Sequence, residues 1–146
     1  MDEIRVVYPS GYYEDIDLGI EKNTFILDLF EDPYGGIWVG TLGQGLVHIF
    51  KNGIRVLDKD AGLSFNNVWS VHQQETGDIY FSLGCGGIDV LQPDGSPNSF
   101  VEIGCSFTAI SDRKGRLWVA LDGITMIDKD NRLSNYQKDK GLLSRT

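Results

Sequence analysis

The residues of this sequence that could do chemistry are short polar side chains placed beside glycines. Gln44 stands inside "GQG", Asn66 follows "GLSF", and Asp122 precedes a glycine. Amide and carboxylate groups suit ligands rich in hydroxyls, and a nearby ring such as Phe65 can stack on the face of a sugar. Turns also favour Asn and Gly, so each residue taken singly is better explained by its turn. The candidate ligand-binding set is Asn23, Gln44, Phe65, Asn66, Asn67, Ser106 and Asp122.

The histidines and cysteines offer little for catalysis. His48 and His72 stand in separate β-prone runs with no further His or Cys at ligand spacing, so we predict no metal site and no Ser–His–Asp arrangement. Two cysteines are too few for a disulfide scaffold or a zinc site. We expect Cys85 and Cys105 as free thiols, with a disulfide as the alternative if their Cα atoms approach within about 7 Å.

The acidic residues are scattered over turns. "DKD" occurs at 58–60 and at 128–130, where we predict solvated turns, with calcium binding as the alternative. We expect Asp32 in "EDPYGG" and Asp112 in "SDRKGR" to cap their turns, because an Asp carboxylate readily accepts hydrogen bonds from nearby backbone N–H groups.

A repeat positions these residues. The stretches "DPYGGIWVGTLGQGLVHIF", "QETGDIYFSLGCGGIDVL" and "DRKGRLWVALDGITMI" are alike, and their ring residues Trp38, Tyr80 and Trp118 recur about every 40 residues. "IRVVYPSG" near the N-terminus matches "LVHIFKNG", so we predict three full units preceded by the latter half of another. The unit boundaries fall at 1–24, 25–66, 67–105 and 106–146.

Each unit contains four short β-prone runs separated by Gly, Asn and Asp turns. Four antiparallel strands per 40-odd residues are typical of a β-propeller blade. We therefore predict an all-β protein of about three and a half blades in an incomplete ring, with Trp38, Tyr80 and Trp118 filling the gaps between blades. A stack of hairpins in an open sandwich is the less favoured alternative.

The first full unit resembles the two-component regulator propeller repeat. The residues that carry this resemblance are Asp32, Gly35, Ile37, Trp38, Val39, Gly40, Thr41, Gly45 and Leu46. "AGLSFNNVWSV" is similar to the segment that links one blade of that family to the next, through Gly62, Leu63, Asn66, Val68 and Val71. The later units depart from the pattern at Gln74 and Tyr80 and in the turn after Leu121.

The resemblance implies a non-catalytic sensor. Such repeats form the periplasmic part of hybrid histidine kinases, which detect carbohydrate fragments. It further implies a periplasmic location and an oligosaccharide as the expected ligand. We expect no cofactor. The alternatives are a protein-interaction scaffold and, less favoured, a propeller lyase. In propellers the ligand end carries the loops between strands two and three and those between blades, where the candidate residues fall.

Composition narrows the partners. The net charge is −8, with 21 acidic and 13 basic residues, so we expect neither nucleic acid nor an anionic membrane surface as a partner. No apolar run approaches a membrane span, and the residues given show no signal peptide. An incomplete ring exposes strand edges and apolar faces, so we expect self-association or further blades in a longer protein. Two copies would supply seven blades' worth of strands.

Overall fold

The structure, a computed structural model, describes residues 3–92, 94–121 and 123–136, and all regular elements among them are β-strands. The strands are β1 (Glu3–Val7), β2 (Tyr13–Asp17), β3 (Ile26–Glu31), β4 (Ile37–Thr41), β5 (Leu46–Phe50), β6 (Gly53–Leu57), β7 (Ser70–Gln73), β8 (Ile79–Ser82), β9 (Ile88–Leu91), β10 (Pro97–Val101), β11 (Thr108–Ser111), β12 (Leu117–Leu121), β13 (Gly123–Ile127) and β14 (Leu133–Tyr136).

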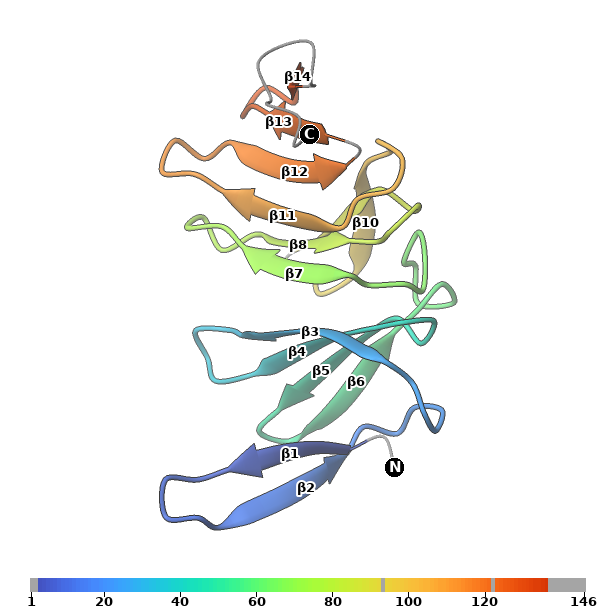
Figure 1. Ribbon diagram of the computed structural model, residues 1–146, viewed down its shortest axis with the longest axis vertical. Helices are drawn as coiled ribbons and strands as arrows, with labels where there is room; N and C mark the ends of the chain where they lie inside the picture. Colours follow the sequence, from blue (N-terminus) through green and yellow to red (C-terminus); the bar gives the residue numbers. More distant parts are fainter. Residues whose placement is uncertain (1–2, 93, 122, 137–146) are drawn as a thin grey trace, which may run out of the picture.

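The strands form four antiparallel sheets that follow one another along the chain (Figure 1). An N-terminal pair, β1–β2, precedes three four-stranded blades: the first blade is β3–β6, the second β7–β10 and the third β11–β14. Within each sheet, every strand pairs with its neighbour in sequence. Between sheets, β7 contacts both β3 and β11. The predicted all-β fold of propeller-type blades in an open ring is confirmed.

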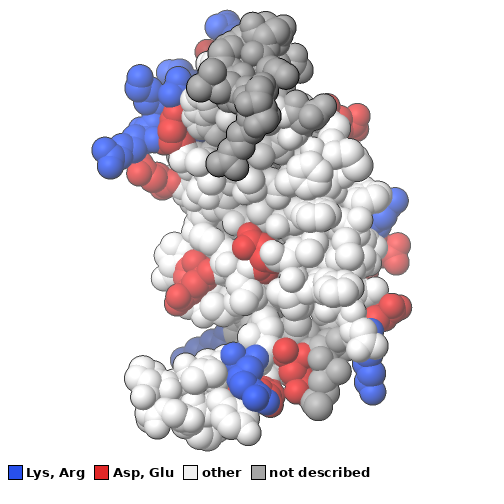
Figure 2. All heavy atoms as spheres, in the orientation of Figure 1, with Lys and Arg blue, Asp and Glu red and all other residues white. Residues whose placement is uncertain are grey.

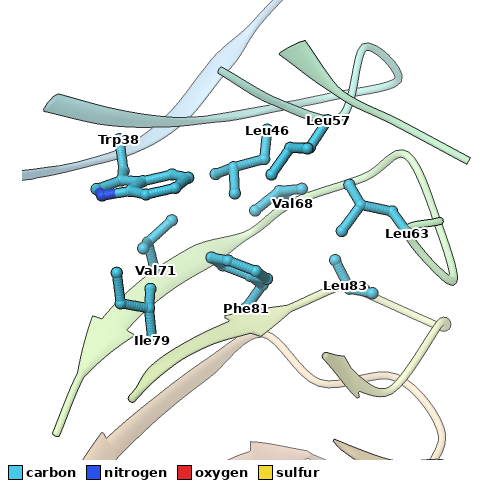
Figure 3. Packing of buried hydrophobic residues seen from close by; sticks show 9 residues of the cluster. All are labelled: Trp38, Leu46, Leu57, Leu63, Val68, Val71, Ile79, Phe81 and Leu83. Carbon is cyan, nitrogen blue, oxygen red and sulfur yellow. The ribbon is translucent and has the colours of Figure 1, made fainter. Parts of the chain in front are cut away.

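Alternation along the strands gives each blade two apolar faces, one toward the preceding sheet and one toward the following sheet. Between the first and second blades, Trp38 is 4% exposed and packs with Val71, Ile79 and Phe81 (Figure 3). A ring on one sheet thus meets smaller side chains on the next. Burial of these faces is the main stabilising term, because one four-stranded sheet cannot cover both of its own faces.

The other two ring residues are placed differently from each other. Tyr80 is buried among residues of the third blade, including Val119, as predicted. Trp118 is only half-buried, because no described sheet packs on its side of the third blade. It lies beside Tyr136, with 5.5 Å between ring centroids. The prediction that Trp118 fills a gap between blades is therefore not met within the described residues.

The Asp residues before the glycine turns cap them, as predicted. Asp32 accepts backbone hydrogen bonds from Tyr34 and Gly36, each at 2.9 Å, and its other oxygen accepts the indole N–H of Trp38 at 3.1 Å. Asp112 repeats this arrangement, including a bond of 2.9 Å from the Trp118 indole. The repeat motif therefore joins a turn to the ring behind it, and in the first blade this ring packs against the next blade.

The Gly-x-Gly turns after the second strand of a blade require glycine. Gly45 has φ of 76°, and an added Cβ would lie 2.1 Å from the carbonyl oxygen of Leu57. Gly87 occupies the matching place in the second blade, with φ of 80° and a Cβ position 2.4 Å from the carbonyl oxygen of Val101. These close approaches let the third strand start directly beside the end of the fourth.

The charged side chains leave broad uncharged areas on the face shown in Figure 2. The turn between β1 and β2 forms an uncharged lobe there, and Tyr8, Tyr12 and Tyr13 around this turn are exposed. Within the described ranges, no helix has the length and apolarity to cross a membrane.

Candidate functional site

One end of the stack carries the linkers between sheets and the turns between the second and third strands of each blade. We call it the linker end; its linkers span residues 18–25, 58–69 and 102–107. Two isolated β-bridges join these parts, Leu42 with Asn67 and Gly84 with Ser106. Each bridge ties the turn of one blade to the linker that leads to the next. This brings most of the predicted ligand-binding residues to one end of the molecule.

Gln44 and Asn66 line the same hollow at the linker end, with a volume of about 500 Å³. We call it the polar hollow; it lies between linker 18–25 and the first blade and is lined by Gly19, Ile20, Glu21, Gly43, Gln44, Val56, Asp58 and Asn66. Two carboxylates and two amides are thus grouped in one concave surface. Such groups donate and accept hydrogen bonds at short range, as a hydroxyl-rich ligand requires.

Asn66 also has a structural role. Its side-chain oxygen accepts the backbone N–H of Lys59 at 2.8 Å, and its carbonyl accepts N–H bonds from Gly43 and Gly45. These bonds hold linker 58–69 against the turn of the first blade. Among the described residues nothing accepts a hydrogen bond from the side-chain NH₂ of Asn66, which leaves that group available to a ligand.

The remaining predicted residues do not join the polar hollow. Phe65 lines a separate hollow of about 400 Å³ with Cys85 and Gly86. Asn23 holds a left-handed turn conformation with φ of 66°, and Asn67 forms the bridge to Leu42. Asp122 lies outside the described residues.

Ser106 is fully buried, and its hydroxyl donates to the carbonyl of Gly87 at 2.6 Å. Ser106 therefore shapes the linker end, and its placement does not support a contact with ligand.

Cys85 and Cys105 form a disulfide, contrary to the expectation of free thiols. The physical reason is the bridge beside them: the Ser106 N–H donates to the Gly84 carbonyl at 2.7 Å, which brings the two Cys-bearing segments together. The disulfide fastens linker 102–107 to the turn between β8 and β9. Sequence spacing placed both residues at one end, but their contact depends on how the short linker crosses it.

Sequence reasoning missed two features of the linker end. Trp69 and Phe107 each precede the first strand of a blade, are 37% and 46% exposed, and meet edge to face with ring centroids 5.3 Å apart. A cavity of about 750 Å³ lies between linker 102–107 and the third blade. The unequal linker lengths visible in the repeat are the sequence signal that points to this cavity.

The two histidines serve structural contacts. His48 stacks on Trp38 with ring centroids 3.8 Å apart, and its Nε2 lies 3.1 Å from Asp32. Burial raises the pKa of Asp32. Hydrogen bonds from Gly36, Tyr34, His48 and Trp38 lower it by more, so the pKa of Asp32 lies below its ordinary value. No group of three or more His, Cys, Asp or Glu suited to a metal ion occurs within the described ranges.

His72 joins the second and third blades. Its Nε2 accepts the backbone N–H of Ser111 at 2.9 Å and lies 2.7 Å from the Ser111 hydroxyl. Burial lowers the pKa of His72. An imidazole that accepts at Nε2 is neutral, with its proton on Nδ1.

Comparison with known families finds one matching model. Residues 20–43 match the family described as two component regulator propeller. This stretch contains linker residues of the polar hollow, the first two strands of the first blade and the Asp32–Trp38 motif. The resemblance to that repeat is confirmed there. Comparison with curated protein sequences returns no significant match.

Solved structures share the fold. The extracellular domain of the hybrid two-component system BT3049 from B. thetaiotaomicron has a TM-score of 0.75 and 24% identity, over 95% of this chain and 21% of that one. The corresponding domain of BT4673 from the same organism has a TM-score of 0.67 and 20% identity, over 91% and 20%.

Virginiamycin B lyase from Staphylococcus aureus has a TM-score of 0.72 and 15% identity, over 93% of this chain and 48% of that one. The chain thus spans about half the length of the lyase and about a fifth of the two sensor domains. At these identities the comparisons establish the fold.

Proposed function

Because residues 20–43 form a two-component regulator propeller repeat, we propose that this chain is a non-catalytic, ligand-sensing part of a two-component sensor and that its ligand is a carbohydrate. The polar hollow is the proposed site. The observation that carries the proposal is the grouping of Glu21, Gln44, Asp58 and Asn66 in one concavity built partly from the matched repeat.

A periplasmic location accompanies the proposal. The disulfide between Cys85 and Cys105 favours an oxidising compartment, because cytosolic thiols are kept reduced. The shared fold with extracellular domains of hybrid two-component systems agrees with this location.

Thermal unfolding with a panel of oligosaccharides tests the proposal. A ligand that binds only the folded chain raises the Tm in a concentration-dependent way. Gln44→Ala should abolish the rise, because it removes an amide of the polar hollow. Gln92→Ala is the matched control: Gln92 is also half-buried, but its backbone forms the turn between β9 and β10 at the opposite end. A rise that survives Gln44→Ala, or no rise with any sugar, contradicts the proposal.

A lyase activity is the second candidate, favoured by the fold shared with virginiamycin B lyase. The contacts of His48 and His72 weigh against it, because Asp32 and Ser111 already engage both rings. Mass spectrometry of any sugar that raises the Tm separates the two functions: a sensor returns it intact, whereas a lyase converts it.

Self-association or further blades are our proposal for covering the exposed apolar faces. Ile110 is 60% exposed on the face of the third blade that carries Trp118, and Leu29 is 54% exposed on the face of the first blade that carries Val39. The strands β1 and β2 match the third and fourth strands of a blade. Two copies would therefore supply two sets of third and fourth strands, and neither copy would supply the first and second strands that complete this blade. A longer protein therefore completes the ring more readily than a dimer. A stable, soluble monomer in light scattering would count against both arrangements.

A further inference from the structure

A linker packs into the interface between the first and second blades. We call the interface between two neighbouring blades a seam, and this one the filled seam. Three consecutive residues of linker 58–69 contact the second blade. Gly62 lies beside Pro97, and Ser64 binds Asp89. Leu63 is 3% exposed and belongs to the core cluster that contains Leu83. The Ser64 N–H and hydroxyl donate to the two oxygens of Asp89 at 2.8 and 2.7 Å. The tripeptide Gly62–Leu63–Ser64 therefore occupies the linker end of this filled seam, and Figure 3 shows Leu63 at the right-hand end of the cluster, above Leu83.

Strand register identifies the same place in the next seam. Asp89 pairs with Phe81 in the second blade, and Thr125 pairs with Val119 in the third, so Thr125 replaces Asp89. By the same register Leu121 replaces Leu83, and Leu133 replaces Pro97. The three residues that receive the tripeptide in the filled seam thus have direct counterparts in the third blade.

These counterparts line the cavity of about 750 Å³, together with Ile103, Phe107 and Asn135. Linker 102–107 is half as long as linker 58–69 and is fastened to the second blade by the disulfide. Its Ile103 packs against the core cluster of this interface beside Leu121, but among the described residues no group of this linker bonds Thr125 as Ser64 bonds Asp89. Among the described residues, the interface between the second and third blades keeps this cavity where the preceding interface holds Leu63 and Ser64, and we call it the hollow seam.

We propose that the cavity of the hollow seam binds an extended peptide segment that carries a leucine-sized side chain followed by a small polar residue. This inference goes beyond the sensing of a sugar in the polar hollow and concerns a different seam. The ligand chemistry is taken from the chain itself, since the matching space in the filled seam holds Gly-Leu-Ser.

The walls of the cavity suit such a peptide. Leu121, Leu133 and Phe107 present an apolar surface for the leucine side chain. The Thr125 hydroxyl donates to the Asn135 side-chain oxygen at 2.8 Å, which leaves the hydroxyl oxygen free to accept a peptide N–H. This acceptor stands where Asp89 accepts the Ser64 N–H.

Thr125 stands in the third blade where Asp89 stands in the second, and a threonine is stable there whether or not a peptide occupies the cavity. Burial raises the pKa of Asp89 even with two bonds from Ser64, so a carboxylate in this place needs its linker partner. Thr125 is 4% exposed and satisfied by Asn135, and it carries no charge. The hollow seam therefore avoids the cost of a buried, unpaired carboxylate.

Fluorescence anisotropy with the full chain and a labelled peptide, acetyl-Asp-Ala-Gly-Leu-Ser-Phe-amide, tests the proposal. The peptide copies residues 60–65. We expect saturable one-to-one binding, and at least a tenfold weaker affinity for the peptide with Asp in place of Leu. Leu133→Trp should abolish binding by filling the cavity. Leu29→Trp should leave it unchanged, because Leu29 is similarly exposed (54% against 49%) and does not line the cavity.

Three outcomes would overturn the proposal: equal affinity for the Leu and Asp peptides, binding by Leu133→Trp equal to that of the natural chain, or loss of binding in Leu29→Trp. Circular dichroism checks that each variant folds, and Asn135→Trp replaces Leu133→Trp if that variant does not. Saturable binding of a small apolar dye without peptide binding would also contradict it. None of these results depends on Gln44, so the peptide site and the sugar site fail or stand separately.

Discussion

The filled seam and the hollow seam have the same strands and different linkers. In both, a ring from one blade (Trp38 or Tyr80) packs on apolar side chains of the next. In the filled seam, linker 58–69 adds Leu63 to the core, whereas in the hollow seam the shorter linker 102–107 adds Ile103 and leaves, among the described residues, a cavity beside it. The comparison teaches that strand patterning decides how blades stack, while linker length decides whether the seam between them is closed at the linker end.

The largest expected difference concerns two leucines at matching positions. Leu83→Ala should lower the free energy of unfolding by about 2–5 kcal/mol, because Leu83 is fully buried in the filled seam. Leu121→Ala should cost about 1 kcal/mol or less, because its side chain already borders a cavity. Urea denaturation of both variants measures the difference. Equal losses would mean that the hollow seam is packed as tightly as the filled one.

The hollow seam should depend on its disulfide. Cys85→Ser combined with Cys105→Ser removes a cross-link between residues 20 positions apart, and the loss of stability should be about 3 kcal/mol from loop closure in the unfolded chain. Reduction of the natural chain should lower its urea midpoint to that of the double variant. A midpoint unaffected by reduction would show that the short linker holds without the covalent tie.

Asp89 and Thr125 occupy matching positions in the second and third blades, and each can be replaced by the other residue. Asp89→Thr replaces two carboxylate oxygens with one hydroxyl oxygen, so the Ser64 N–H and hydroxyl cannot both keep their bonds, and the change should cost about 1–3 kcal/mol. Thr125→Asp should also destabilise, and increasingly so as the pH rises through the raised pKa of the new buried carboxylate, because the short linker offers it no serine. A stable Thr125→Asp variant at neutral pH would contradict the assignment of a missing linker segment.

The smallest expected effect is a pH dependence at the contact between the second and third blades. The pKa of His72 is lowered in the folded chain, so its contribution to stability is present above the unfolded value of about 6.5 and is lost as the pH falls below it. His72→Phe copies Phe30, which has the matching register in the first blade. The Tm of the natural chain should fall more between pH 7.5 and 5 than that of His72→Phe; parallel curves would exclude His72 as the cause.

The spacing of apolar residues and glycine turns within each repeat made the blades predictable. The site was less predictable, because it depends on contacts between residues that are far apart in the sequence. Trp38 and Tyr80 were correctly placed because a ring behind a glycine turn faces the next sheet wherever that sheet exists. Gln44 and Asn66 were brought to one hollow because turns of this topology share an end. The burial of Ser106 was not predicted, because it depends on a bridge to a turn some twenty residues away.

The sequence alone determined the repeat, the four-stranded units, the capping role of Asp32 and Asp112 and the end of the stack where polar residues gather. These follow from local spacing and turn chemistry. Only the tertiary structure decided that Cys85 meets Cys105 and that one seam is filled while the next is hollow. The physical reason is that a linker's path depends on which side chains of the next sheet receive it, and that choice is made between residues far apart in the chain.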